Sequence, residues 1–435
     1  MSTSVQPKHR AGAPAPQIFP HPGKRPAHPA DDPFHVPPDG FGAAAPGTVL
    51  RARPVDIGFL GLRRQRVTAW QLLYRSTDPH GAPEVSVTTV LVPAGHDPHS
   101  PRLLAYQCAI NSSERSCFPS YCLLQGARGP FANPQIELLL MAAALRQGWI
   151  VSVADHGGQP GRYVVARQPG YHVLDGLRAT LQFAELRLPA DTAIGLWGYS
   201  GGGLASSWTA EMAPDYAPEL NIVAAALGSP ASDPSKILER ADGGLFAGLG
   251  IAAISALRGS YPALDYVLTE HLTRQGEEVM TTVRGLSTGQ AVGRYAMRNF
   301  DRFVDLPIAE LMALPDVVAM SEDLRLGKVA PTCPVYIYTA VHDQLVGIDE
   351  VDRQAQFYAT HGADVTYRRD RLSEHLSLVI LGAPAALRWL AQRLEGMAPE
   401  SGARTVNSML GSTPALWTMA VMSAAAARVF AGRQL

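Results

Sequence analysis

The stretch IGLWGYSGGGLASSW, residues 194–208, decides the fold because it joins a strand pattern, a sharp turn and a helix pattern. The residues up to Gly198 are apolar, as in a buried strand, and the residues after Ser200 place Leu204 and Trp208 on one helical face. Gly-x-Ser-x-Gly at such a junction is typical of a nucleophile elbow, where small residues permit a tight, strained turn. The helix that follows directs backbone N–H groups at a developing oxyanion. We therefore predict that Ser200 is a nucleophile.

The same five-residue pattern occurs a second time, around Ser287, without this context. The preceding residues, GEEVMTTVRG, are charged and do not form a buried strand. In a chain with 40 glycines, one chance match is unsurprising. The pentapeptide alone would equally fit an inert glycine-rich turn, and only the flanking strand and helix favour the elbow at Ser200.

Strand and helix patterns alternate on both sides of the elbow. Strands are expected at residues 85–94, 102–107, 149–154, 193–198, 221–230, 335–340 and 364–369, and helices at 134–148, 171–187, 201–212, 350–361 and 376–394. This alternation predicts an α/β fold with a mostly parallel sheet covered on both faces. Between residues 233 and 330 the pattern becomes helical and punctuated by glycine, which is far longer than a βα connection needs. We expect an inserted helical cap there.

A serine nucleophile needs a base, and the base needs a carboxylate to hold its tautomer. In this fold class the chain order is serine, acid, histidine. Asp343 follows the strand VYIYTA, and His375 follows the strand DVTYRR, so both are expected at the edge of the sheet that carries Ser200. The rival side chains are expected to be solvated, capping or turn residues: His342, His361, Asp349, Asp364 and Asp370.

The oxyanion hole needs two hydrogen-bond donors. One is expected from the backbone N–H of Gly201, and the other from the loop after an early strand, which we assign to ADHGG with Asp155 first. An acid beside an anion can donate through its backbone N–H, or through its side chain if protonated. The alternative is that Asp155 is a helix cap or a turn residue.

Composition excludes several classes of protein. The net charge of −1 leaves no basic surplus for nucleic acid, and the 17% charged residues, against roughly 25% in an average domain, indicate a large buried core. Without a C-x-x-C pair or a histidine-rich segment, the cysteines are expected to be structural or free thiols, although three of them are near enough in sequence for a local disulfide. They are Cys108, Cys117, Cys122 and Cys333.

Five segments are predicted along the 435 residues. They are a proline-rich extended or disordered arm (1–30), the first part of the core (31–232), the cap or lid (233–330), the second part of the core (331–397) and a tail or flap (398–435). The N-terminus shows no apolar run of a signal peptide, so the sequence by itself predicts a cytoplasmic protein. Polar residues interrupt the apolar part of the tail, which favours a packed amphipathic helix over a membrane span.

Several stretches resemble the secretory lipase family typified by Candida lipase A, from residue 31 to about residue 394. They are SYCLL near 120, VADHGG, LDGLRA (174–179), GYSGGG, YAPELNIV (216–223), GGLFAG (243–248), HDQLV and EHLS. The resemblance implies an α/β-hydrolase core whose cap encloses an acyl-chain tunnel. It also implies that Ser200, Asp343 and His375 form a triad, with Asp155 and Gly201 at the oxyanion hole. Members of the family are normally secreted and hydrolyse triacylglycerols and other carboxylic esters.

The predicted reaction is acyl transfer through an acyl-enzyme, which requires no metal or organic cofactor. The predicted partner is a lipid or other acyl ester, met at a lipid–water interface, and the apolar cap indicates medium or long acyl chains. A carboxylesterase for smaller esters, an acyltransferase, a peptidase and a non-catalytic hydrolase-like binding protein are the alternatives. A dinucleotide site is not supported, because GYSGGG lacks the G-x-G-x-x-G register.

Overall fold

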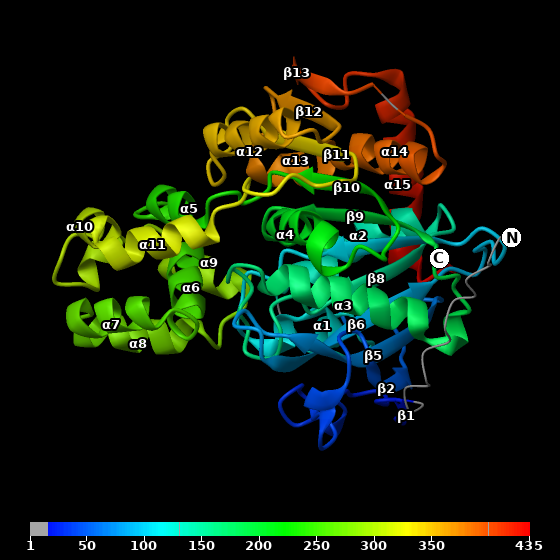
Figure 1. Ribbon diagram of the computed structural model, residues 1–435, viewed down its shortest axis with the longest axis horizontal. Helices are drawn as coiled ribbons and strands as arrows, with labels where there is room; N and C mark the ends of the chain where they lie inside the picture. The colour runs from blue at the N-terminus through cyan, green and yellow to red at the C-terminus, as the bar shows by residue number, and fades with distance from the viewer. Residues whose placement is uncertain (1–15, 130, 399) are drawn as a thin grey trace, which may run out of the picture.

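One large mixed sheet organises the chain (Figure 1). The computed structural model describes residues 16–129, 131–398 and 400–435. The main sheet has 11 strands in the order β1-β2-β5-β6-β8-β7-β9-β10-β11-β12-β13. These strands are β1 (Gln17–Ile18), β2 (Val49–Pro54), β5 (Thr68–Thr77), β6 (Pro83–Val92), β7 (Arg102–Gln107), β8 (Ile150–Ala154), β9 (Ala193–Tyr199), β10 (Ile222–Gly228), β11 (Val335–Ala340), β12 (Val365–Asp370) and β13 (Gly402–Val406). A separate hairpin consists of β3 (Gly58–Phe59) and β4 (Arg63–Arg64).

The part of the sheet that carries the elbow is parallel. Strands β8, β7, β9, β10, β11, β12 and β13 pair in parallel, whereas the pairs β2–β5, β5–β6 and β6–β8 are antiparallel. The residues that follow the parallel strands therefore meet at one edge of the sheet. Strand β8 lies between β6 and β7, so the direct neighbours of β9 are β7 and β10.

Helices cover both faces of the sheet, as the alternating pattern predicts. One face carries α3 (Gln168–Gln182), α4 (Gly201–Tyr216) and α12 (Ile348–Thr360), and the other carries α1 (Pro119–Cys122), α2 (Asn133–Leu145), α13 (His375–Leu381), α14 (Ala383–Leu394) and α15 (Thr413–Ala431). Trp197 and Leu196 of β9 enter the two opposite cores, because successive side chains of a strand point to opposite faces. A strand buried on both faces is apolar without alternation, which is the pattern seen before Ser200.

A helical insertion lies between β10 and β11. Its helices are α5 (Pro234–Ala241), α6 (Ala247–Arg258), α7 (Pro262–His271), α8 (Arg274–Val283), α9 (Thr288–Tyr295), α10 (Ile308–Ala313) and α11 (Pro315–Leu324). They enclose a core of their own that includes Ile251 and Leu257 and that receives Leu204 and Trp208 from α4. Figure 1 shows α7, α8, α10 and α11 projecting away from the sheet. The insertion is thus anchored on the helix that follows the elbow.

The described residues near both termini pack more closely than composition indicates. Residues 1–15 of the predicted arm lie outside the described residues, but β1 pairs with β2, and Pro26 and Pro29 are buried. At the other end, α15 is 19 residues long with a mean hydropathy of 1.3, and is the one described helix apolar enough to cross a membrane. Met422 and Val429 of α15 pack into the core beside α2 and α14, whereas Trp417 is exposed.

The cysteines are buried free thiols, and none of them is paired. Burial raises the pKa of Cys117 to about 11 and the pKa of Cys333 to about 12, so thiolate chemistry at neutral pH is disfavoured. Among the described residues, no group of three or more His, Cys, Asp or Glu side chains is placed to hold a metal ion.

Candidate active site

Ser200 occupies the sharp turn between β9 and α4. Its backbone has φ 55° and ψ −117°, a conformation that residues with a side chain rarely adopt. Its N–H continues the β9–β10 pairing by donating to the carbonyl oxygen of Gly228 at 2.8 Å. A Cβ at Gly198 would overlap the carbonyl of Gly202, and a Cβ at Gly202 would overlap the carbonyl of Gln107. The two flanking glycines are therefore required by close backbone approach at a strained turn.

The structure brings Ser200, His375 and Asp343 together. His375 Nε2 lies 2.9 Å from Ser200 Oγ, and His375 Nδ1 lies 2.8 Å from Asp343 Oδ2. The Asp343 side chain is fully buried and that of His375 is 5% exposed. The backbone N–H groups of Leu345 and Val346 donate to Asp343 Oδ1 at 2.9 and 2.8 Å. The carboxylate is thus held in place, and it can orient the imidazole toward the serine hydroxyl.

His375 is fixed at the first residue of α13. The preceding residue, Glu374, caps this helix in a reciprocal pair with Ser377. The His375 N–H donates to Gln344 Oε1 at 3.1 Å, and the hydroxyl of Tyr199 donates to the His375 carbonyl at 2.7 Å. These contacts fix the backbone of His375, and the bond from Nδ1 to Asp343 orients its ring.

The rival side chains lie elsewhere. His342 is exposed, and His361 stacks on Phe357 at the exposed end of α12. Asp370 is buried, but its carboxylate accepts backbone N–H groups, including that of Ser373. The remaining two rivals are Asp349, in the first turn of α12, and Asp364, which pairs with Arg393.

The structure does not place Asp155 at the predicted oxyanion hole, because it lines neither pocket that contains Ser200 and its N–H donates to the carbonyl of Val87 at 2.8 Å. It follows β8, and β7 separates β8 from β9, so two strand spacings, about 10 Å, lie between the two strand ends. The Asp155 carboxylate accepts the backbone N–H of Ser120 at 2.9 Å. Burial raises the pKa of this carboxyl to about 7. In this position Asp155 ties α1 to the end of β8, which corresponds to the alternative reading as a residue that holds a turn.

Asn111 is the residue that the sequence reasoning missed. It belongs to the loop that follows β7, residues 108–112, which we call the β7 loop. A Cβ at Gly201 would overlap the Asn111 side chain, and Asn111 lines both pockets that contain Ser200. Gly201 begins α4, so its N–H has no partner within the helix. The Asn111 carboxamide therefore lies beside Gly201, whose N–H has no helical partner, and both residues line one pocket with Ser200.

Two side chains from the first turns of α2 hold the β7 loop in place. Asn133 Nδ2 donates to the carbonyl of Ala109 at 2.7 Å, and the Ala109 N–H donates to Glu137 Oε1 at 3.0 Å. Asn133 and Glu137 are four residues apart on one face of α2, and together they bind the carbonyl and the backbone N–H of Ala109. Burial raises the pKa of the Glu137 carboxyl to about 7. His156 Nε2 adds a contact to the carbonyl of Cys108 at 2.8 Å.

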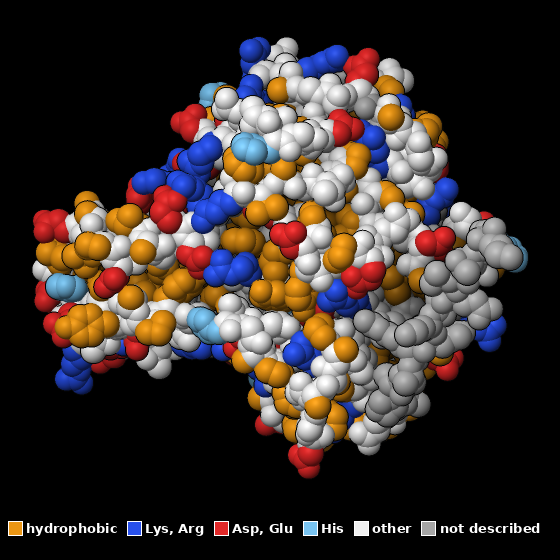
Figure 2. Space-filling view, in the orientation of Figure 1, with side chains coloured by type: hydrophobic (Ala, Val, Ile, Leu, Met, Phe, Trp, Pro, Cys, Tyr) orange, Lys and Arg blue, Asp and Glu red, His pale blue; other side chains and the backbone are white. Residues whose placement is uncertain are grey.

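Two apolar pockets meet at Ser200. The larger, about 290 Å³, lies between the sheet edge and the insertion and includes Ile136, Phe246 and Val379. The smaller, about 60 Å³, includes Leu238 of the insertion. Figure 2 shows hydrophobic side chains gathered where the insertion meets the sheet and its helices.

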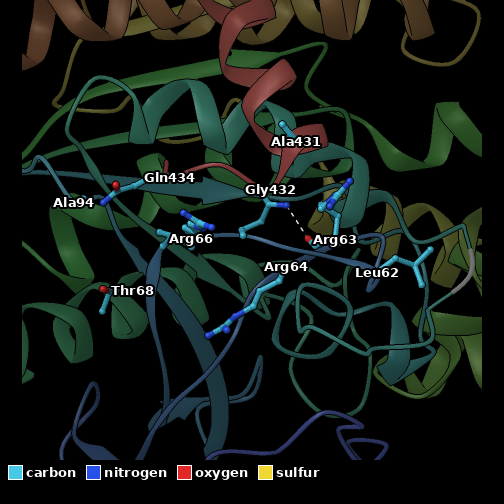
Figure 3. Close-up of a pocket in the computed structure, with 11 residues that line it drawn as sticks. Leu62, Arg63, Arg64, Arg66, Thr68, Ala94, Ala431, Gly432 and Gln434 are labelled. Atoms are coloured by element: carbon cyan, nitrogen blue, oxygen red, sulfur yellow. Dashed lines mark hydrogen bonds between the residues drawn. The ribbon is translucent and has the colours of Figure 1, made fainter.

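A more voluminous pocket, about 810 Å³, lies at the far edge of the sheet (Figure 3). Arginine side chains surround it, including Arg63 and Arg66, beside the end of α15. Thr68 and Ala94 also line this pocket, at the start of β5 and just after the end of β6. In the sheet these ends lie opposite the carboxyl ends of the parallel strands. The pocket of about 810 Å³ is therefore separate from the site around Ser200.

Comparisons with known proteins find lipases among the sequences similar to this chain. The family model described as secretory lipase matches residues 131–402. A Mycobacterium tuberculosis protein named "probable inactive lipase" is 45% identical over 413 residues, which cover 94% of this chain and 93% of that protein. Lipase A of Arthroderma benhamiae is 34% identical over 390 residues, which cover 87% of this chain and 82% of that protein.

Two solved structures of one lipase share the fold of this chain. The X-ray structure of Candida antarctica lipase A matches with a TM-score of 0.83 at 25% identity, covering 93% of this chain and 95% of that chain. The same lipase in its closed state matches with a TM-score of 0.79 at 26% identity, covering 90% of this chain and 95% of that chain. The fold class predicted from the sequence, an α/β fold with a mostly parallel sheet, is confirmed.

Proposed function

This chain belongs to the secretory lipase family, and from that premise we propose that it is an active serine hydrolase of lipid esters. One observation carries the proposal: the hydrogen-bonded series from Ser200 Oγ through His375 to Asp343, with distances of 2.9 and 2.8 Å. The mycobacterial relative is named a "probable inactive lipase". In this chain the nucleophile, base and orienting acid are present and in contact, which supports activity.

The first half of the proposed reaction forms an acyl-enzyme. His375 Nε2 accepts the Ser200 proton as Oγ attacks the ester carbonyl, and Asp343 stabilises the imidazolium that results. The N–H of Gly201 and the side-chain amide of Asn111 donate to the oxyanion of the tetrahedral intermediate. His375 then protonates the leaving alcohol, and the C–O bond to that alcohol breaks.

The second half regenerates the enzyme. Water enters the position vacated by the alcohol, and His375 Nε2 accepts one of its protons as its oxygen attacks the acyl carbon. The same two donors hold the second oxyanion. Collapse of this intermediate breaks the bond to Ser200 Oγ, which recovers its proton from His375 and releases the carboxylic acid.

A fluorophosphonate probe tests the proposal directly. An activated Ser200 is expected to be labelled at close to one probe per chain, with the modified peptide identified by mass spectrometry. The same preparation is expected to hydrolyse p-nitrophenyl esters, and heat-denatured protein is the control for both readouts. Folded protein that neither takes up the probe nor hydrolyses any ester would place it with inactive members of the family.

The shape of the site leads to a prediction on acyl-chain length. The pocket of about 290 Å³ is mostly apolar, and Leu249 lies in both pockets that meet at Ser200. We propose that the insertion acts as a lid over these pockets, and we expect kcat/KM to rise from acetate to octanoate in a p-nitrophenyl ester series, because each buried methylene adds apolar contact. Leu249→Trp, which narrows both pockets, should move the optimum to shorter chains. A sharp maximum at acetate would contradict the prediction and indicate a small-ester esterase.

A further inference from the structure

The helical insertion makes side-chain hydrogen bonds to the β7 loop. The hydroxyl of Thr288 is shared between the carbonyl oxygens of Ile110, at 3.1 Å, and Asn111, at 3.3 Å. The hydroxyl of Ser112 donates to the carbonyl of Leu286 at 2.8 Å. Thr288 is 8% exposed and lines the larger pocket at Ser200. The start of α9 is therefore joined to the loop that carries Asn111, although the two are 177 residues apart in the chain.

These contacts lie within the second Gly-x-Ser-x-Gly segment and explain its sequence. Ser287 is the N-cap of α9, where its side chain and that of Gln290 form a reciprocal capping pair. Gly289 lies directly against Phe131, whose side chain would collide with a Cβ at that position. Ser287 thus caps α9, whereas the hydroxyl of the next residue, Thr288, donates to carbonyls of the β7 loop.

The backbone of Asn111 turns sharply within the β7 loop. Its φ of 44° lies in the left-handed region, which asparagine adopts more readily than most residues with a side chain, and contacts from two sides hold the loop in this conformation. Thr288 donates to the carbonyls of Ile110 and Asn111. Two side chains of α2 bind the N–H and the carbonyl of Ala109, the residue before Ile110. The β7 loop is therefore held on one side by the core and on the other by the insertion.

We propose that Thr288 is a positioning residue that fixes Asn111 at the oxyanion hole, so that the insertion sets the geometry of catalysis as well as covering the pocket. This inference rests on the proposed ester hydrolysis. Preorganised donors help only when they are aimed at the developing charge, so a small rotation of the β7 loop lowers the rate of the chemical step. Substrate binding depends mainly on the apolar walls and should change little.

Three variants separate this role from mere packing. Thr288→Val keeps the shape of the side chain and removes the donor, and it is expected to lower kcat about tenfold with KM within about threefold. Thr288→Ser keeps the hydroxyl and should restore kcat to within about twofold of the parent. The matched control, Ser287→Ala, removes the α9 cap and is expected to lower the melting temperature while leaving kcat unchanged. Rates are normalised to fluorophosphonate-titrated sites, and Thr288→Ala replaces the valine variant if that variant misfolds.

A double-mutant cycle with Asn111→Ala decides whether Thr288 acts through Asn111. Without the Asn111 amide, Thr288→Val is expected to have almost no further effect on kcat. Equal effects of Thr288→Val in both backgrounds, or a kcat equal to that of the parent, would overturn the inference while ester hydrolysis itself stands. A parent protein that neither labels nor turns over would instead remove the proposed function.

Discussion

Replacing Ser200 by alanine is expected to lower kcat for p-nitrophenyl ester hydrolysis at least about a thousandfold. The variant loses the hydroxyl that lies 2.9 Å from His375 Nε2, and with it the acyl-enzyme route. What remains is attack by water assisted by the oxyanion donors and the binding pocket. Initial rates at saturating ester, measured with the parent at matched concentration, give the ratio.

Ser287→Ala is the matched control for this experiment, because it removes the serine of the other Gly-x-Ser-x-Gly segment. Ser287 caps α9, so kcat should stay at the parent level in that variant. Fluorophosphonate labelling should likewise vanish in Ser200→Ala and persist in Ser287→Ala. Turnover of the Ser200→Ala protein within tenfold of the parent would show that another group is the nucleophile.

Asn111→Ala is expected to lower kcat by about a hundredfold to a thousandfold, with a small change in KM. The side chain lies against Gly201 and lines both pockets at Ser200. An oxyanion donor acts on charge that develops only in the transition state, so its loss affects the chemical step more than substrate binding. Steady-state kinetics over an ester series separates the two parameters.

Asp155→Ala is the comparison that tests the alternative location of the oxyanion hole, because it removes every side-chain donor at that position. The Ser120 N–H loses its acceptor in this variant, so the melting temperature is expected to fall while kcat per labelled site stays within a few-fold of the parent. The reverse result, a large loss of kcat in Asp155→Ala and parent-like kcat in Asn111→Ala, would return the oxyanion hole to the loop after β8.

The positions of Ser200, Asp343 and His375 could be predicted from the sequence because each follows a buried strand. Parallel strands deliver the residues after them to one edge, so a strand pattern followed by a reactive side chain already implies where that side chain lies. The same logic failed for Asp155, which also follows a buried strand. The sequence does not reveal that β7 lies between β8 and β9, and neighbours in a sheet are set by packing rather than by chain order.

The contacts of the β7 loop could not be found from local sequence patterns. Asn111 lies in a loop without a strand or helix signature, and its partner Thr288 lies in an insertion on the far side of the elbow. Ile110, the other residue that Thr288 binds, is 178 positions from it. Periodicity and capping rules describe neighbours along the chain, so they predict the helices of the insertion without placing them against the loop.

The helical insertion separates Ser200 from Asp343 and His375 along the chain, and this separation sets the order in which the parts of the site are synthesised. Ser200 precedes His375 by 175 residues, so a ribosome completes the elbow long before the base exists. Strands β7, β9 and β10 can associate early, whereas β11 can join β10 only after the whole insertion has been synthesised. Closing so long a loop costs little more entropy than closing one of half its length. A nascent chain therefore carries Ser200 without its base until β11 and β12 have been synthesised, and the proposed hydrolysis becomes possible only after that point.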